Sequence, residues 1–256
     1  MSDLLLEIDG PVARVTLNRP QAFNALNAGI RDAMRAAIAT IDADDAVRVV
    51  ILSGAGRGFC AGTDLAENLG GQSTTDFILR EYQPLLSAIA ASPKLWIAQV
   101  HGSAAGIGAA LALVCDLMTI AETATLYLAF AAIGLVPDGG TTWQLHRALG
   151  PRHALQTILE GRRIPADEAV ARGLANAAHP EAELAPETAA LALRLTRGAP
   201  LAAAAAKRLM RVMDGLSLDA AIAAEAQEQG PLARSADARE GMTAFFEKRA
   251  PVFRGA

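Results

Sequence analysis

One glycine-rich segment offers backbone groups that could take part in chemistry. Residues 101–116, HGSAAGIGAALALVCD, place Gly102, Gly106 and Gly108 just before and at the start of an apolar helix. Glycine permits backbone torsions and close approaches that larger residues resist, and the first N–H groups of a helix have no acceptor within it. Such donors suit an anion, or a carbonyl oxygen that becomes anionic during a reaction. Taken alone, the segment also fits a plain strand-to-helix crossover in which glycine only relieves crowding.

Two further segments add to this pattern. Residues 53–65, SGAGRGFCAGTDL, follow the apolar run at residues 47–52, so a strand again leads into a glycine-rich turn that can face the first. Residues 134–143, GLVPDGGTTW, place Asp138 at the entrance of a predicted helix. A carboxylate at that position can move a proton. It can equally serve as the N-cap of the helix, accepting from the N–H groups of residues 139–142.

Hydrophobic spacing predicts the elements that position these turns. Apolar residues from Leu26 to Ile41 recur at the spacing of one helix face, with Asn27 as the predicted N-cap. Residues 47–52 are apolar throughout, as in a strand that crossover helices bury on both faces. The repeated order of strand, glycine turn and helix indicates an α/β fold with βαβ organisation. We expect strands at residues 3–9, 12–17, 47–52, 95–100, 117–121 and 125–130, and helices at residues 27–42, 141–149 and within 161–176.

The C-terminal quarter has a different composition. Residues 183–247 are alanine-rich and helical by propensity, with expected breaks near residues 198–200, Gly215 and residues 230–231. The more polar residues 65–92 predict a loop followed by a helix. A mixed α/β core is therefore expected to precede an all-helical region.

Composition excludes several classes of partner. The 256-residue chain has a formal net charge of −4 and a sequence pI of about 5.6, without the basic balance typical of nucleic-acid binding. Asp116 and Glu122 divide the apolar residues 104–136 into runs too short to cross a bilayer. The first residues, MSDLLLEIDG, lack the basic start of a signal peptide, so we expect a cytoplasmic protein. Cys60 and Cys115 have no metal-type spacing, and we expect neither a disulfide nor a metal site.

Three motifs in this order resemble the enoyl-CoA hydratase/isomerase, or crotonase, superfamily. They are FCAGTDL, AAGIGAAL and GLVPDGG, and the resemblance extends from NRPQAFNAL at residues 18–26 to EKRAPVFRG at residues 247–255. The motifs are most similar to the phenylacetyl-CoA-type isomerase branch. The resemblance implies a crotonase-like α/β spiral of ββα units in residues 1–182 and an all-helical trimerisation region in residues 183–256. It also implies an acyl-CoA thioester substrate, no cofactor beyond the coenzyme A of that substrate, and a homotrimer or dimer of trimers.

The resemblance also assigns roles to individual residues. It implies that the backbone N–H groups of Thr63 and Ile107 form an oxyanion hole for the thioester oxygen, with isoleucine replacing the glycine usual in the family. It places coenzyme A contacts at Ala61 and Gly62, and at Lys248 and Phe253 toward a neighbouring subunit. Three aromatic residues are candidates for the acyl pocket, although buried aromatics also serve as plain core; they are Tyr127, Phe130 and Trp143.

The acids of this site favour one reaction over another. Family hydratases carry glutamates where this chain has Ala110 and Phe130, and neither substitute can move a proton. Asp138 stands where certain isomerases and dehalogenases of the family carry a functional aspartate. We therefore expect an acyl-CoA isomerase that shifts a double bond, with Asp138 as the proton shuttle. The alternatives are an enoyl-CoA hydratase in which Asp138 acts through a water, and a catalytically silent acyl-CoA-binding subunit.

The remaining polar residues near these motifs are expected to be structural. Asp64 is predicted to cap or brace the first glycine turn, Asp116 to end a helix, and His101 to leave a strand.

Overall fold

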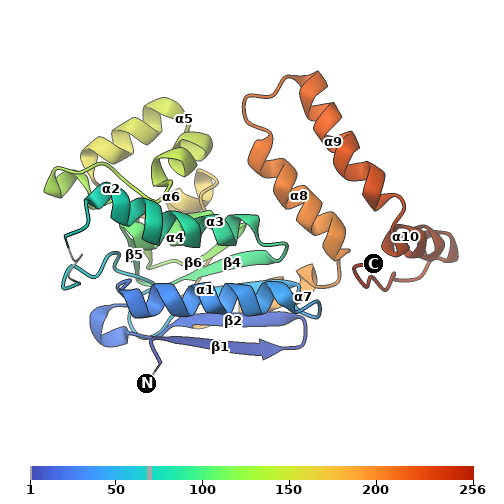
Figure 1. The fold of residues 1–256 in the computed structure, drawn as a ribbon, viewed down its shortest axis with the longest axis horizontal. Helices are drawn as coiled ribbons and strands as arrows, with labels where there is room; N and C mark the ends of the chain where they lie inside the picture. Colours follow the sequence, from blue (N-terminus) through green and yellow to red (C-terminus); the bar gives the residue numbers. More distant parts are fainter. Residues whose placement is uncertain (1, 68–70) are drawn as a thin grey trace.

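The main sheet positions the two glycine-rich turns. The structure is a computed structural model that describes residues 2–67 and 71–256. Its main sheet has the order β1-β2-β3-β4-β6-β9, in which β1 and β2 form an antiparallel hairpin and the later neighbours are parallel. Figure 1 shows α1 lying along the β1–β2 hairpin. The strands are β1 (Leu4–Asp9), β2 (Val12–Leu17), β3 (Val49–Gly54), β4 (Leu95–Val100), β6 (Leu117–Ala121) and β9 (Ala177–His179).

Helices cover both faces of this sheet. Val50 and Leu52 of β3 join the large core cluster on the side of α1 (Ala28–Ala43). Val49 and Ile51 face the other way and pack near α7 (Glu181–Leu195), whose Ala192 is fully buried. This explains why the strand is apolar at every position. The α1 helix begins at Asn27, whose side chain accepts a 2.9 Å hydrogen bond from the N–H of Ile30, as predicted for an N-cap.

A second, smaller sheet extends from the end of β4. It has the order β5-β7-β8, formed by β5 (Ser103–Ala105), β7 (Thr125–Tyr127) and β8 (Arg163–Pro165). The predicted strand at residues 125–130 is therefore too long, because β7 pairs with three-residue partners on both sides. A short 3-10 helix, η3 (Ala131–Ile133), follows the strand.

The segment after the first glycine turn is irregular. It contains α2 (Thr74–Phe77), a π-helix, η2 (Ile78–Tyr82), and α3 (Gln83–Ala91). Pro84 has no N–H and its ring would clash with the carbonyl four residues earlier, so the backbone widens here rather than continuing as a regular helix. The loop predicted before this helix includes residues 68–70, which lie outside the described residues.

Helices α4 (Ile107–Val114), α5 (Thr141–Glu160) and α6 (Ala166–Ala171) complete the α/β body. The predicted helix at residues 141–149 is the first half of α5. Gly150 then adopts φ 71° and ψ 166°, which interrupts the helix, and Pro151 begins its second half. Proline suits that position because its missing N–H would have no helical acceptor in a first turn.

The C-terminal helices stand partly apart from this body. They are α8 (Pro200–Val212), α9 (Leu218–Leu232) and α10 (Ala236–Glu247), and Figure 1 shows α8 and α9 as a hairpin beside the α/β body. The expected breaks near residues 198–200 and at Gly215 are present. The break expected at residues 230–231 is wrong, because α9 continues through Pro231 in its final turn and the chain changes direction at residues 233–235. The expected boundary at residues 182/183 falls inside α7, which packs on the sheet.

No helix among the described residues combines the length and hydropathy that a membrane span requires.

A buried ion pair attaches α8 to the body. Lys207 Nζ lies 2.9 Å from Asp116 Oδ2, and it also donates to the carbonyl oxygens of Ile89 and Lys94. Asp116 Oδ1 accepts a 3.0 Å hydrogen bond from Arg211. The Lys207 side chain is only 3% exposed, and burial lowers its pKa while the Asp116 carboxylate opposes that shift. Asp116 thus has the structural role expected of it.

Replacing Asp116 by alanine should destabilise the fold strongly. The substitution leaves the Lys207 ammonium group buried without its anionic partner, which typically costs about 3 kcal/mol or more. Urea denaturation monitored by circular dichroism measures this loss. Asp214→Ala is the matched control, because Asp214 pairs with Arg147 but its side chain is 58% exposed, and loss of an exposed pair costs about 1 kcal/mol at most. Equal losses in the two variants would contradict the assigned role.

Candidate active site

The two glycine-rich turns are in direct contact. Residues Cys60 and Ala104 form an isolated parallel bridge, in which the Ala105 N–H donates to the Cys60 carbonyl at 2.8 Å. A Cβ on Gly108 would lie 2.5 Å from the same carbonyl oxygen, so a side chain at this position would collide with backbone. A Cβ on Gly62 would lie 2.9 Å from the Ala105 carbonyl oxygen. The glycines therefore permit a close approach of the turns that larger residues would prevent.

The N–H of Thr63 is available at the first turn. Gly62 has φ 105°, and its carbonyl accepts a 2.7 Å hydrogen bond from the N–H of Leu26. The same peptide unit carries the Thr63 N–H, which has no acceptor among the described residues. Asp64 braces this turn, since its carboxylate accepts a 2.8 Å hydrogen bond from Arg19, as expected.

The N–H of Ile107 is available at the second turn. Gly106 adopts φ 53°, and its carbonyl accepts from the N–H of Ala109 at 3.0 Å, at the start of α4. Within the part of the chain that is described, the Ile107 N–H likewise has no acceptor. A Cβ on Gly106 would lie 3.9 Å from the Gly62 Cα. The structure thus brings two unpaired backbone donors onto adjacent turns.

The isoleucine side chain packs beneath the turn that carries Asp138. A Cβ on Gly139 would lie 2.4 Å from Ile107 Cδ1 and 2.8 Å from Ala110 Cβ. Gly139 itself adopts φ 59°. Gly139 is therefore required both by its torsion and by this contact, which places the turn that carries Asp138 against the Ile107 side chain.

Asp138 is a half-buried carboxyl group with a free oxygen. Its Oδ1 atom is buried and has no hydrogen-bond partner among the described residues. Burial raises the pKa of this carboxyl, and a hydrogen bond to its own backbone partly opposes the rise. The N-cap interpretation is wrong, because Gly140 occupies the N-cap of α5 and no side chain caps that helix.

Neighbouring carboxylates are engaged in ion pairs. Hydrogen bonding to Arg19 lowers the pKa of Asp64. Glu67 pairs with the buried Arg31 at 2.7 Å. Glu81 also pairs with Arg31, and a hydrogen bond from Arg35 is the largest cause of its lowered pKa. Asp138 differs from these acids because burial, and no cation, dominates its surroundings.

The predicted pocket aromatics lie in different surroundings. Phe130 is near the second turn, since a Cβ on Gly106 would lie 3.8 Å from its Cζ. The Tyr127 ring lies 4.1 Å from the Arg163 guanidinium carbon, and its carbonyl accepts from the Gly106 N–H. Trp143 is 47% exposed and stacks with Arg147 at 4.4 Å. Its ring lines a hollow that α8 closes through Ala206 and Met210.

The residues assigned to coenzyme A fall into two groups. Ala61 and Gly62 lie in the first turn, where Ala61 is exposed and donates to the Phe23 carbonyl at 2.9 Å. Lys248 ends α10 in a left-handed conformation, and Phe253 packs against Gly241 of the same helix. Figure 1 shows α10 on the side of the molecule opposite α2. Within one chain, the two groups are therefore not brought together.

Tyr82 is a site residue that the sequence analysis missed. Its hydroxyl oxygen lies 2.7 Å from Thr63 Oγ1, and the side chain is 1% exposed. The phenol's pKa rises to about 12, mainly through burial, and the Asp138 carboxylate contributes to the rise. The one available signal was Pro84, which predicts an irregular helical turn at this position.

Comparisons with known proteins bear on the family and the fold. Residues 7–256 match the family model described as enoyl-CoA hydratase/isomerase. A probable enoyl-CoA hydratase of Rhodobacter capsulatus is 42% identical, over 97% of this chain and 96% of its own length. The 1,2-epoxyphenylacetyl-CoA isomerase of Escherichia coli K12 is 34% identical, over 100% and 99%. The crystal structure of an enoyl-CoA hydratase from Bacillus anthracis superposes with a TM-score of 0.93 at 29% identity, covering 99% of this chain and 100% of that one.

Removing the Asp138 charge should change how stability depends on pH. Because burial raises its pKa, the folded protein holds this proton more tightly than the unfolded chain, and stability falls as pH rises through that range. Asp138→Asn should therefore exceed wild type in unfolding free energy at neutral pH by about 1 kcal/mol, and match it below the ordinary carboxyl pKa. Urea denaturation across pH measures the difference.

Asp64→Asn is the control with the opposite sign. The pKa of Asp64 is lowered in the folded protein. Its contribution to the stability of the fold is therefore present at neutral pH and is lost as the pH falls through this lowered pKa. This variant should therefore be less stable than wild type at neutral pH. If wild type had a larger unfolding free energy than Asp138→Asn at neutral pH, that result would refute the proposed burial of an unpaired charge.

Proposed function

The chain belongs to the enoyl-CoA hydratase/isomerase family, and we propose that it is an acyl-CoA isomerase that shifts a double bond in an enoyl-CoA thioester. It has the crotonase fold, with an α/β body followed by C-terminal helices. The observation that carries the proposal is the Asp138 carboxyl, whose buried Oδ1 has no hydrogen-bond partner among the described residues and whose turn packs against Ile107, the residue that carries one of the two backbone donors.

In the proposed mechanism the Thr63 and Ile107 N–H groups bind the thioester oxygen. Asp138 removes a proton from the α or γ carbon of the acyl chain, and the electrons of the broken C–H bond move onto the thioester oxygen as an enolate. The two donors stabilise that developing negative charge. Protonated Asp138 then returns the proton to the other carbon, which leaves the double bond shifted and the enzyme unchanged. No cofactor is needed beyond the coenzyme A of the substrate.

The environment of Asp138 supports isomerisation over hydration. Addition of water requires groups that hold and activate a water molecule, whereas a double-bond shift requires one group that accepts and returns a proton. Three acids in and after the first turn, Asp64, Glu67 and Glu81, are paired with arginines, and Ala110 and Phe130 supply no acid. The raised pKa of Asp138 brings it closer to the range in which a carboxyl group exchanges a proton efficiently at neutral pH.

Hydration is the second candidate, with Asp138 acting through a water. The name of the 42% identical relative, a probable enoyl-CoA hydratase, favours it, whereas that of the 34% identical isomerase favours the double-bond shift. Water addition to crotonyl-CoA and double-bond migration in a panel of enoyl-CoA esters separate the two reactions. A silent acyl-CoA-binding subunit would bind these esters and turn over none of them.

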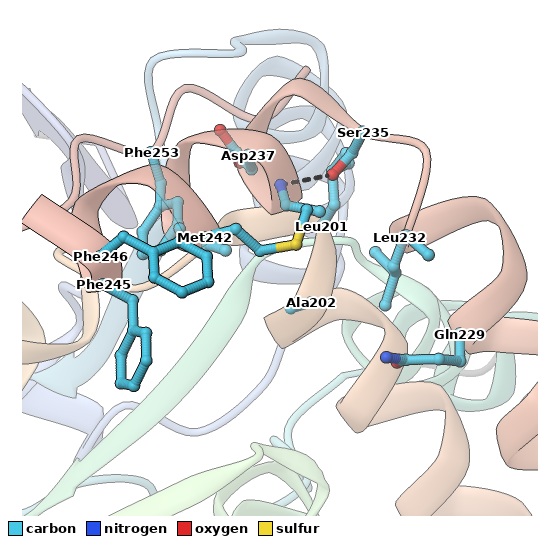
Figure 2. A pocket seen from close by; sticks show the side chains of 14 residues that line it. Leu201, Ala202, Gln229, Leu232, Ser235, Asp237, Met242, Phe245, Phe246 and Phe253 are labelled. Carbon is cyan, nitrogen blue, oxygen red and sulfur yellow. Dashed lines mark hydrogen bonds between the residues drawn. The ribbon is translucent and has the colours of Figure 1, made fainter.

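We further propose that the protein assembles as a homotrimer or a dimer of trimers through its C-terminal helices. Figure 2 shows an apolar pocket in which Met242 points toward Leu201, with Phe245 and Phe246 beside it. Phe245 and Phe246 are 79% and 80% exposed in the single chain, an arrangement more typical of an interface than of a free surface. In such an assembly Lys248 and Phe253 approach the coenzyme A of a neighbouring subunit.

Within one subunit, Ala61 and Gly62 contact the coenzyme A beside the first donor. Tyr127, Phe130 and Trp143 form the acyl pocket in this proposal. The Phe130 ring lies beside Gly106 of the second turn, so we assign it the contact with the acyl atoms next to the thioester.

Asp138→Asn should abolish most of the proton transfer while leaving binding intact. Asparagine keeps the shape of the side chain but cannot accept the proton, so exchange of the substrate's α or γ protons with solvent should fall at least about 100-fold. Nuclear magnetic resonance in heavy water measures the exchange, and calorimetric titration measures affinity for the CoA ester. Turnover by the variant, or rapid hydration of crotonyl-CoA by wild type, would move the assignment to the hydratase.

Charged residues on α10 should disrupt the assembly. Phe245→Asp combined with Phe246→Asp places charges on a surface that the proposal buries, so the sedimentation coefficient should fall to that of a monomer. Leu159→Asp is the control, because Leu159 is a 69% exposed leucine on α5, and it should leave the assembly intact. A wild-type protein that sediments as a monomer at micromolar concentration would sink this proposal.

A further inference from the structure

The buried phenol group of Tyr82 contacts the first glycine-rich turn, which carries the Thr63 N–H. Its hydroxyl lies 2.7 Å from Thr63 Oγ1, although the residues are 19 apart in sequence. Tyr82 is the last residue of the π-helix η2 and is 1% exposed. Irregular π turns of this kind occur frequently at functional sites, since they re-aim a side chain that a regular helix would direct elsewhere.

Several contacts fix the phenol ring in place. The Phe77 ring meets it edge to face, with centroids 5.1 Å apart, and the Arg31 guanidinium lies over the Phe77 ring at 5.0 Å. Arg31 is held in turn by two hydrogen bonds to Glu67, at 2.7 and 2.9 Å, and one to Glu81 at 3.0 Å. A ring supported in this way has little freedom, so its hydroxyl group is preorganised toward Thr63.

The two backbone donors are held by different means. The peptide unit that carries the Ile107 N–H is fixed through the Gly106 carbonyl, which accepts from the N–H groups of Ala109 and Ala110 at the start of α4. The unit that carries the Thr63 N–H follows a glycine with φ 105° and belongs to no helix. Its carbonyl accepts one hydrogen bond, from Leu26. On the other side of Thr63, the Asp64 N–H donates to the Leu26 carbonyl at 3.1 Å, so Leu26 holds the backbone on both sides of this residue. The Thr63 hydroxyl adds a side-chain contact to the turn, with Tyr82.

We propose that Tyr82 is a positioning residue, which holds the Thr63 N–H in the orientation of the oxyanion hole through the Thr63 hydroxyl. This inference rests on the proposed role of the Thr63 and Ile107 amides. Tyr82 acts as a neutral hydrogen-bonding group in this role, because burial keeps the pKa of its phenol near 12.

The test is the carbonyl stretch of a bound thioester, measured by infrared spectroscopy with butyryl-CoA carrying carbon-13 at the thioester carbonyl. This saturated ester has no double bond to shift, so the spectrum reports polarisation by the donors without turnover. In wild type the stretch should move to lower frequency on binding. Tyr82→Phe and Thr63→Val should each reduce that shift, whereas Thr63→Ser, which keeps a hydroxyl group, should retain most of it.

Kinetics provide a second readout. Tyr82→Phe should lower kcat about 10-fold, with KM changed less than about 2-fold, because one buried hydrogen bond that orients a donor is lost. The Tyr82→Phe/Thr63→Val double variant should fall no further than the more affected single variant, because both substitutions remove the same interaction. The fall of kcat at acid pH should remain in Tyr82→Phe, since the proposed mechanism attributes it to protonation of Asp138.

Thr188→Val is the matched control. It removes one hydroxyl of a buried pair, Thr119 Oγ1 and Thr188 Oγ1 at 2.6 Å, which joins β6 to α7 outside the described site. It should leave the carbonyl shift and kcat unchanged, even where stability falls. If Tyr82→Phe does not fold, the comparison of Thr63→Val with Thr63→Ser carries the test.

The outcomes separate this inference from the proposed function. A wild-type spectrum without a shift on binding would refute the oxyanion hole itself. A normal wild-type shift that Tyr82→Phe and Thr63→Val both retain would overturn only the role of Tyr82. Loss of a basic limb of the pH profile in Tyr82→Phe would also overturn it, because that result would make Tyr82 a proton donor. Additive losses in the double variant would show that the two hydroxyl groups act separately.

Discussion

The close approach of two backbone turns is the constraint on which the rest of the structure depends. Gly108 lies so near the Cys60 carbonyl, and Gly62 so near the Ala105 carbonyl, that a Cβ at either position would sit 2.5 or 2.9 Å from an oxygen. The parallel strands β3 and β4 deliver both turns to the same edge of the sheet. Because the donors at this edge are backbone N–H groups, their placement depends on the fold and on glycine more than on the side chains of Thr63 and Ile107.

The charged groups near this edge of the sheet are of two kinds: ion pairs that stabilise the structure, and the Asp138 carboxyl group. The ion pairs of Arg31 with Glu67 and Glu81 fasten the segment after the first turn to α1 and η2, and each of these charges has a partner. Asp138 has no ion-pair partner among the described residues, and its burial is a local cost to folding that the surrounding core must offset. A buried carboxyl group that weakens the fold in this way is a candidate for function.

The sequence predicts the parts of this architecture that local rules determine. The apolar strand at residues 47–52, the N-cap at Asn27 and the glycine turns all follow from spacing and residue type. The position of Tyr82 does not, because it depends on a π-helix and on a contact with a residue 19 positions away. The continuation of α9 through Pro231 was also missed, since a proline in the final turn removes a hydrogen bond near the end of the helix, where its loss costs least. The hollow that Trp143 lines is formed in part by α8, and no motif near Trp143 reveals that packing.

The two backbone donors are held in place by different parts of the structure. The Ile107 N–H begins α4, so its orientation is tied to a buried helix and cannot change without moving the core. The Thr63 N–H lies in a non-helical turn that is held by backbone hydrogen bonds to Leu26 and by side-chain contacts, among them the Thr63–Tyr82 hydroxyl pair. Substitutions at Tyr82 therefore act on the first donor through the Thr63 hydroxyl, whereas the second donor is held by the start of a helix. That asymmetry provides a physical route by which the strength of one half of an oxyanion hole can be adjusted while the fold stays the same.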